Sequence, residues 1–233
     1  MFRRLFKLVK LAGLSFFIPI SYFKLRRMTL SEGLFSNLKK KGAFAFVRIG
    51  DGEIAILLGE KTVYEDSSFM KAMKMLHILM DSDDAIVFGL PLERMKFSFT
   101  RSFFVFWAYS YVMIPLLVNT KGPYYSSFIF REGGDLTANI AALVDFINGF
   151  DDVFYLTSNK LNYNNLKKRV TVDIQYVEVE KTFSAYKFCK DLNSHKSLIL
   201  VSFGTSGKFL AYDMCRQHSM KVIDIGAINF SGV

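Results

Sequence analysis

One short run, FAFVRIGDGE at residues 44–53, ends in a group of residues that can do chemistry. The group consists of Arg48, Gly50, Asp51, Gly52 and Glu53. Carboxylate oxygens are the ligands that Mg²⁺ and Mn²⁺ prefer, and glycines let the backbone approach a ligand closely. Arg48 can face an anion. The run therefore predicts a site for a divalent metal and a phosphate.

Two backbone geometries are open for this run. If the chain stays extended, Asp51 and Glu53 share one face, because side chains two residues apart in a strand do so, and both can reach one cation. If the chain turns at the glycines, Asp51 serves the turn and Glu53 begins a helix. In that second case the carboxylates serve backbone geometry rather than a metal.

A second candidate lies near the C-terminus, where the sequence GTSG follows the apolar run 198–203. Backbone N–H groups at a helix N-terminus bind anions, so Gly204, Thr205 and Ser206 are candidate ligand-binding residues. The alternative is an ordinary strand–helix turn with a hydroxyl cap. Asp224, at the end of another apolar run, is a further candidate. Neither a Walker A loop nor a Gly-x-Gly-x-x-Gly fingerprint is present.

Strand-length apolar runs alternate with helix-length periodic segments, and these elements must position the candidate residues. We expect strands at 43–49, 85–89, 127–130, 153–157, 170–177, 198–203 and 221–225. We expect helices at 31–40, 67–80, 99–117, 136–146, 161–168, 183–192 and 206–217. The alternation predicts an α/β fold, doubly wound and Rossmann-like, with a mostly parallel sheet and helices on both faces. Ligands of such folds gather beyond the carboxyl ends of the strands, where the candidates stand.

The positive charge is concentrated at one end of the chain. The chain has 233 residues and a net charge of +9. Residues 1–28 contain seven basic side chains and no acidic one. The rest carries 23 basic and 21 acidic residues, which argues against a broad nucleic-acid-binding face. We therefore predict a basic amphipathic segment at 1–28, a single domain at 29–233 and no nucleic-acid partner.

The apolar middle of that segment, residues 11–20, is too short to span a bilayer as a helix. A segment lying on an anionic membrane surface fits the pattern, since Lys and Arg meet headgroups while Phe and Leu insert. The alternative is a helix docked on the protein's own core. Two cysteines, Cys189 and Cys215, are expected to be buried thiols in a reducing compartment.

With these residues in view, the chain resembles the GT-D-fold glycosyltransferases, a bacterial family formerly described as a domain of unknown function. The family's Arg-x-Gly-Asp-Gly-Glu run stands here as residues 48–53. Its C-terminal motifs stand as GTSG at 204–207, LAYD at 210–213 and IDIG at 223–226. The resemblance covers about residues 30–230.

The resemblance implies a sugar-nucleotide transferase of the hexosyltransferase type. It maps the metal and donor site onto Asp51 and Glu53, with Mn²⁺ or Mg²⁺ bridging to the diphosphate of a nucleotide sugar, UDP-sugar above all. Arg48 would add electrostatic stabilisation. Glu53 is either a metal ligand or the general base. Gly50, Gly52, Gly204, Thr205, Ser206 and Asp224 would line the donor site.

The implied acceptor is a glycan or a lipid-linked sugar in bacterial surface polysaccharide or glycoprotein glycan synthesis. The implied location is cytoplasmic and peripheral, at the inner face of the cell membrane. One alternative stays open, because Ala227 stands where the family has His. It is a non-catalytic, membrane-associated scaffold of a polysaccharide assembly complex.

Overall fold

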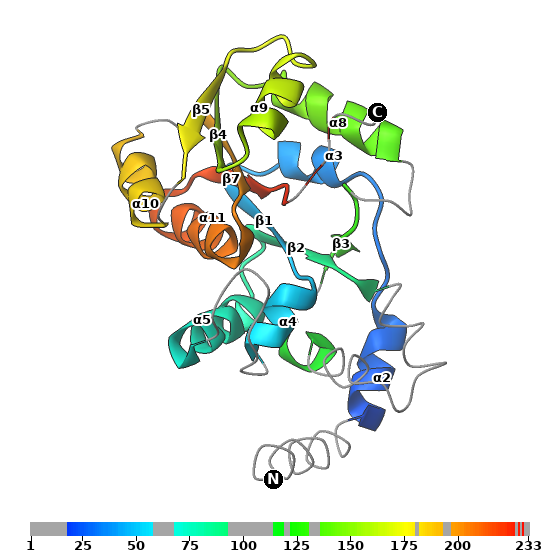
Figure 1. Ribbon diagram of the computed structural model, residues 1–233. Coiled ribbons are helices and arrows are strands. Elements are labelled where there is room, and N and C mark those ends of the chain that lie inside the picture. The colour runs from blue at the N-terminus through cyan, green and yellow to red at the C-terminus, as the bar shows by residue number, and fades with distance from the viewer. Residues whose placement is uncertain are drawn as a thin grey trace.

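The computed structural model describes residues 18–57, 68–92, 114–118, 122–130, 136–179, 182–192, 197–226, 228 and 230. Its centre is one sheet of seven parallel strands in the order β3-β2-β1-β7-β6-β4-β5 (Figure 1). The strands are β1 (Phe44–Arg48), β2 (Ile86–Leu90), β3 (Tyr125–Ser126), β4 (Asp152–Thr157), β5 (Ile174–Glu178), β6 (Ser197–Ser202) and β7 (Lys221–Asp224).

Helices pack on both faces of this sheet, and each face has its own hydrophobic core between the sheet and the helices. One face carries α2 (Ile18–Arg27), α4 (Asp51–Leu57), α5 (Phe69–Met80), α10 (Thr182–Asp191) and α11 (Gly204–His218). The other carries α3 (Leu34–Lys39), α8 (Leu136–Ile147) and α9 (Lys160–Lys167). The predicted doubly wound α/β fold is therefore confirmed.

The two cores follow from the alternation of side chains along the strands. In β1, Ala45 and Val47 face one core, whereas Phe44 and Phe46 face the other. Strands covered on both faces need apolar residues at every position, which is why the central strands read as continuous apolar runs. All five residues of β1 are buried, including Arg48 at its end.

Several element boundaries differ from expectation for local reasons. The helix expected from Ser31 begins at Leu34, because Gly33 takes a left-handed φ of 71° and the Ser31 N–H bonds to the Tyr124 carbonyl. The strand expected at 127–130 is β3 at 125–126, and the chain turns after it, where the Phe128 N–H bonds to the Ser126 hydroxyl. β5 begins at Ile174 rather than residue 170. Of the helix expected at 99–117, the described part is helical at 114–117.

Helix α2 lies within the segment predicted as a basic N-terminal appendage. Its Leu25 and the following Met28 are buried in the core that also contains α4 and α5, so this part of the segment docks on the protein. Residues 1–17 lie outside the described residues, and the division at residue 28 stays a prediction. Within the described parts of the chain, no helix combines the length and apolarity needed to cross a membrane.

Phe146 on α8 gives a test of the second core. Its ring centroid lies 5.1 Å from Phe35, 6.0 Å from Phe44 and 5.1 Å from Phe150. Removing the ring leaves a cavity among these neighbours, so Phe146→Ala should lower the free energy of unfolding by about 3–5 kcal/mol in urea titrations. The exposed Leu161→Ala is the control and should change it little. Equal losses in both variants would contradict this packing.

Candidate active site

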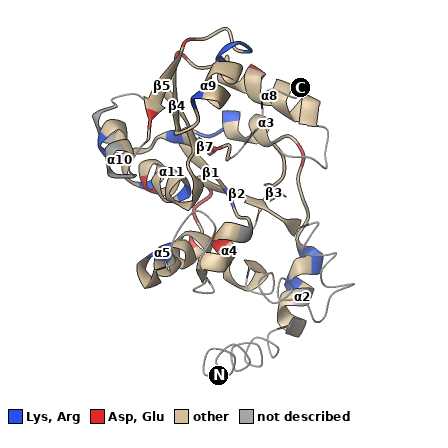
Figure 2. Cartoon of the chain, in the orientation of Figure 1, with Lys and Arg blue, Asp and Glu red and all other residues tan. Residues whose placement is uncertain are grey.

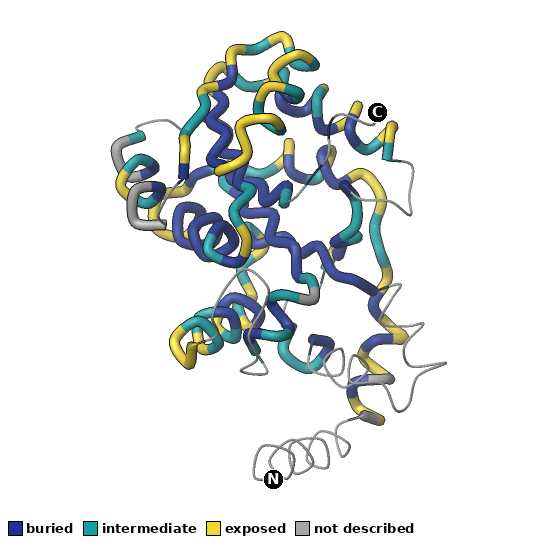
Figure 3. The backbone as a smooth tube through the Cα atoms, in the orientation of Figure 1, coloured by how far each residue is buried: buried dark blue, intermediate teal, exposed yellow. Residues whose placement is uncertain are grey.

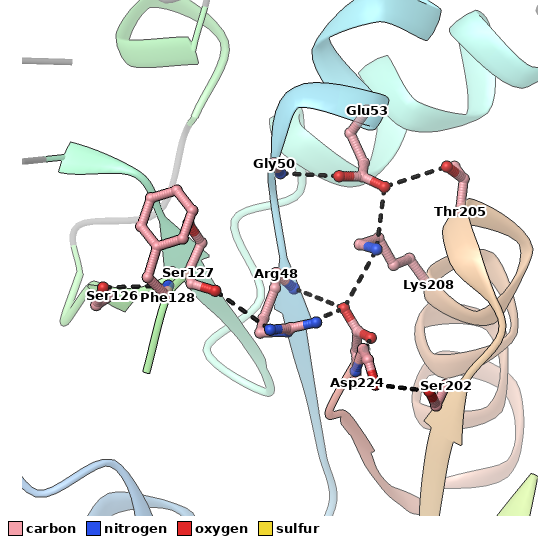
Figure 4. A network of polar contacts seen from close by, with 11 residues as sticks. Arg48, Gly50, Glu53, Ser126, Ser127, Phe128, Ser202, Thr205, Lys208 and Asp224 are labelled. Carbon is pink, nitrogen blue, oxygen red and sulfur yellow. Dashed lines mark hydrogen bonds and ion pairs between the residues drawn. The ribbon is translucent and has the colours of Figure 1, made fainter. Parts of the chain in front are cut away.

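Four charged side chains from distant parts of the sequence meet at the carboxyl ends of β1 and β7 (Figure 4). Arg48 ends β1, Asp224 ends β7, Glu53 lies in the first turn of α4, and Lys208 lies in the first turns of α11. All four are buried, with at most 7% of each residue exposed. Two cations and two carboxylates balance, so the cluster carries no net charge.

Glu53 is held on both carboxylate oxygens. Its Oε2 accepts the Gly50 N–H at 2.8 Å, while Oε1 accepts the Thr205 hydroxyl at 3.1 Å and lies 3.0 Å from Lys208 Nζ. The bond to Gly50, three residues earlier, is the returning half of a capping box and closes the start of α4. Glu53 thus joins the end of β1 to the start of α11.

Asp224 is the second centre of the cluster. Its Oδ2 lies 3.5 Å from Arg48 Nε, 3.4 Å from the Arg48 backbone nitrogen and 3.4 Å from Lys208 Nζ. Its Oδ1 accepts the Gly226 N–H at 3.0 Å. Arg48 also donates from Nη1 to the Ser127 carbonyl at 3.2 Å, which connects the cluster to the chain after β3.

Lys208 stays charged despite its burial. Burial alone lowers the pKa of a lysine, but the carboxylates of Asp224 and Glu53 outweigh it, even against Arg48, and the pKa of Lys208 lies above its ordinary value. An ammonium is therefore fixed between two carboxylates, directly after the N-terminal turn of α11. A buried lysine of this kind is stable only when it is paired.

Gly226 is required by Arg48. Its φ of 56° is left-handed, and a Cβ placed there would lie 1.4 Å from Arg48 Nη2. The guanidinium therefore passes over a bare backbone position. The Gly226 carbonyl in turn accepts the Ser202 hydroxyl at 2.6 Å, which ties this turn to the end of β6.

The structure brings most of the predicted site residues together. Arg48, Gly50, Glu53, Thr205 and Asp224 belong to one network. Two others, Gly204 and Ser206, stand beside it in the first turn of α11, which begins at Gly204 rather than Ser206 as expected. Gly52 lies in α4, with nothing within 4 Å of an added Cβ.

The extended geometry considered for the first motif does not occur, because α4 begins at Asp51. Residues two apart in a helix point in different directions, so this backbone does not put Asp51 and Glu53 on one face. The side chain of Asp51 lies outside the described residues.

The described residues around Glu53 do not fit a divalent cation in this arrangement. Both of its oxygens accept hydrogen bonds from the protein, and the Lys208 ammonium already compensates its charge. Among the side chains that the structure describes, no group of three or more His, Cys, Asp or Glu can hold a metal ion. A metal at this site would depend on Asp51 and stays a prediction.

Lys208 was not foreseen from the sequence. The available signal was its place directly before the apolar run 209–211, in a helix of which ten of the first twelve residues prove to be buried. A lysine inside such a run needs a carboxylate partner. Which carboxylate it meets depends on the tertiary fold.

The LAYD motif at 210–213 connects helices rather than joining this cluster. The Tyr212 hydroxyl donates to Asp81 at 2.7 Å and lies 3.0 Å from His77 Nε2 on α5. Asp213 accepts the Tyr186 hydroxyl of α10 at 2.5 Å and pairs with Lys74 of α5. Burial, followed by these carboxylates, raises the pKa of both tyrosines, so they remain donors at neutral pH.

The cysteines are buried and free, as expected. Burial raises the pKa of the Cys189 thiol to about 12 and that of Cys215 also to about 12, with the nearby Asp81 adding to the shift at Cys215. Both are therefore protonated at neutral pH and poor nucleophiles.

Solved structures of domain of unknown function 1792 (DUF1792) share this fold. One, described as having a distinct glycosyltransferase fold, superposes with a TM-score of 0.67 and 22% identity over 89% of this chain and 82% of that chain. Another, described as a new glycosyltransferase (DUF1792) from Streptococcus sanguinis, gives 0.65 and 22% over 83% and 78%.

No family model and no curated protein matches the chain. The structural likeness shows the fold: the chain has the distinct glycosyltransferase fold described for DUF1792. The resemblance to GT-D-fold glycosyltransferases expected from the sequence is confirmed at this level.

Lys208→Met should lower the free energy of unfolding by about 3–5 kcal/mol, because it leaves the buried Glu53 without its cation and Asp224 with Arg48 alone. The raised pKa means that the lysine's contribution is complete below pH 10.5 and is lost only as pH rises through the folded-state value. The deficit measured by urea unfolding should therefore be constant from neutral pH to about pH 10.

The matched control is Lys167→Met, which removes an exposed lysine that lies 3.2 Å from Asp173. This substitution should change stability little, because solvent screens an exposed pair. A Lys208→Met protein as stable as the control would show that the buried pairs do not hold the cluster.

Gly226→Ala should destabilise the protein and displace Arg48, because alanine adds a Cβ inside the guanidinium's volume at a left-handed φ. Gly52→Ala is the control, since its Cβ meets open space within a helix. Thermal unfolding should show a lower Tm for Gly226→Ala and an unchanged or higher Tm for Gly52→Ala. The reverse order would rule out the close approach.

Proposed function

We propose that this protein is a glycosyltransferase that moves a sugar from a nucleotide-diphosphate sugar to a glycan or lipid-linked acceptor. The observation that carries the proposal is a balanced, buried charge cluster at the carboxyl ends of β1 and β7, beside the N-terminus of α11, in a fold shared with glycosyltransferases. Ligands of doubly wound folds bind at this edge.

The site suits a donor that leaves as a diphosphate. Backbone N–H groups of the first turn of α11, at Gly204, Thr205 and Ser206, offer an anion-binding end of a fifteen-residue helix. Arg48 and Lys208 lie behind that turn, where Glu53 and Asp224 balance their charges and hold them in place. Preorganised backbone N–H donors stabilise the negative charge that develops on a leaving nucleotide.

Within this proposal Glu53 is a positioning residue. It holds Lys208 and Thr205 in place through hydrogen bonds and an ion pair, and it fixes Gly50 at the start of α4. These contacts occupy the carboxylate, so the general-base role considered from the sequence is not part of the proposal. Asp224 orients Arg48 and Lys208 in the same way.

The finer features are proposed on the resemblance. The donor would be a UDP-hexose, and the product a surface polysaccharide or glycoprotein glycan of a bacterium. A Mn²⁺ or Mg²⁺ ion, if one is used, would be held through Asp51 and would neutralise diphosphate charge. The protein would work at the cytoplasmic face of the membrane, with residues 1–28 against anionic lipid.

The test is donor-induced thermal stabilisation with a panel of nucleotide sugars, each with Mn²⁺ and with EDTA. A donor at one hundred times its Kd should stabilise the protein by about 2.7 kcal/mol. Ser206→Asp should abolish that response, because a carboxylate at the α11 N-terminus repels a diphosphate while suiting the helix dipole. Slow donor hydrolysis, followed by nucleotide release, is the second measurement.

Asn162→Asp is the matched control, since it adds the same charge to the first turn of α9 on the opposite face of the sheet. It should respond to the donor like the unmodified protein. If no donor stabilises the unmodified protein or is hydrolysed, the transferase proposal fails and the scaffold alternative gains. A full response in Ser206→Asp would place the diphosphate elsewhere.

A further inference from the structure

Helix α2 has two distinct faces. Ser21, Leu25 and Met28 are buried and spaced at four and three residues, so they form the face that docks on the core. The opposite face presents Ile20, 58% exposed, and Phe23, 63% exposed. The docked helix and the membrane-surface segment considered from the sequence are therefore compatible, because each uses a different face.

The exposed side of α2 is also basic. Lys24, Arg26 and Arg27 lie in its last turn, and its ten residues include no acid (Figure 2). Large apolar side chains beside basic ones form the pattern by which a helix lies in a bilayer interface.

Helix α5 repeats the apolar part of this pattern. Met75, Ile78 and Leu79 are buried, whereas Phe69, 77% exposed, and Met70, 74% exposed, lie in its first turn. Figure 3 shows buried and exposed stretches of backbone alternating along α5. Met73 and Met80 are also exposed and continue the stripe at helical spacing. Like α2, the helix has no acidic residue, but its two lysines are half-buried, and Lys74 pairs with Asp213 of α11.

The two helices belong to the same layer of the molecule. The buried residues of α2 and α5 pack into one core, on one face of the sheet. Six of the seven large apolar side chains that are exposed in the described part of the chain come from these two helices. The seventh, Leu161, lies on α9 on the opposite face. Exposed apolar side chains gathered in this way mark an interaction surface.

We propose that the outer faces of α2 and α5 form a surface that binds an anionic lipid bilayer. Each basic residue near such a surface contributes about 1 kcal/mol, and the apolar side chains insert between headgroups. A second copy of the chain is a poorer occupant, because it would bring the exposed basic residues of two α2 helices to one interface. This surface rests on the membrane location proposed above and specifies which residues would contact the lipid. It does not depend on whether the protein transfers a sugar.

The experiment is co-sedimentation of the full chain with phosphatidylcholine vesicles, with and without phosphatidylglycerol. Two double variants remove the exposed apolar pairs: Ile20→Ser with Phe23→Ser on α2, and Phe69→Ser with Met70→Ser on α5. Each should weaken binding to the anionic vesicles by about tenfold, which corresponds to about 1.4 kcal/mol. The matched control, Leu161→Ser, should bind like the unmodified protein. High salt should weaken all binding.

Equal binding by the unmodified protein and both double variants would overturn the proposal, as would equal binding to neutral vesicles. If only the α2 variant binds the vesicles more weakly, the proposal that α5 contributes to lipid binding is overturned. Weaker binding by Leu161→Ser to the same extent would show that the effect is not specific to this face. Unchanged melting temperatures confirm that the variants fold, and donor-induced stabilisation reports separately on the proposed transferase site.

Discussion

The rest of the site depends on the ion pairs that the buried ammonium of Lys208 makes with two carboxylates. The ammonium lies 3.0 Å from Glu53 and 3.4 Å from Asp224, so it joins α11 to α4 and to β7 at one point. An unpaired charge at this depth would cost several kcal/mol, and the same is true of either carboxylate. The four charged groups are therefore stable only as a set, and the set fixes the ends of β1 and β7 relative to the starts of α4 and α11.

This constraint explains why a glycine stands at position 226. Arg48 reaches Asp224 and the Ser127 carbonyl by passing over Gly226, where a Cβ would lie 1.4 Å from its Nη2. Gly50 offers a backbone N–H to Glu53 at the point where β1 turns into α4. Gly226 makes room for a side chain, whereas Gly50 contributes a backbone N–H to the start of a helix.

Much of the fold could be predicted from the sequence because burial on both faces leaves a clear pattern. Continuous apolar runs such as 198–203 indicate central parallel strands, and the polar residues after them indicate the ligand edge. The sequence did not decide between an extended chain and a helix start at residues 50–53, although Gly50 and Glu53 stand at capping-box spacing. The partner of Lys208 could not be predicted, because residues 53 and 224 approach it only through the order of strands in the sheet.

The two C-terminal motifs, LAYD at 210–213 and IDIG at 223–226, have different structural roles. Asp224 belongs to the charge cluster, whereas Tyr212 and Asp213, twelve and eleven residues earlier, bind side chains of α5 and α10. Helix α11 therefore holds one buried cation of the site, Lys208, on its first turns and anchors the neighbouring helices on its middle turns. Since α5 also carries the proposed lipid-binding stripe, α11 is the element that would hold a membrane-facing helix and the sugar-transfer site in one rigid layer.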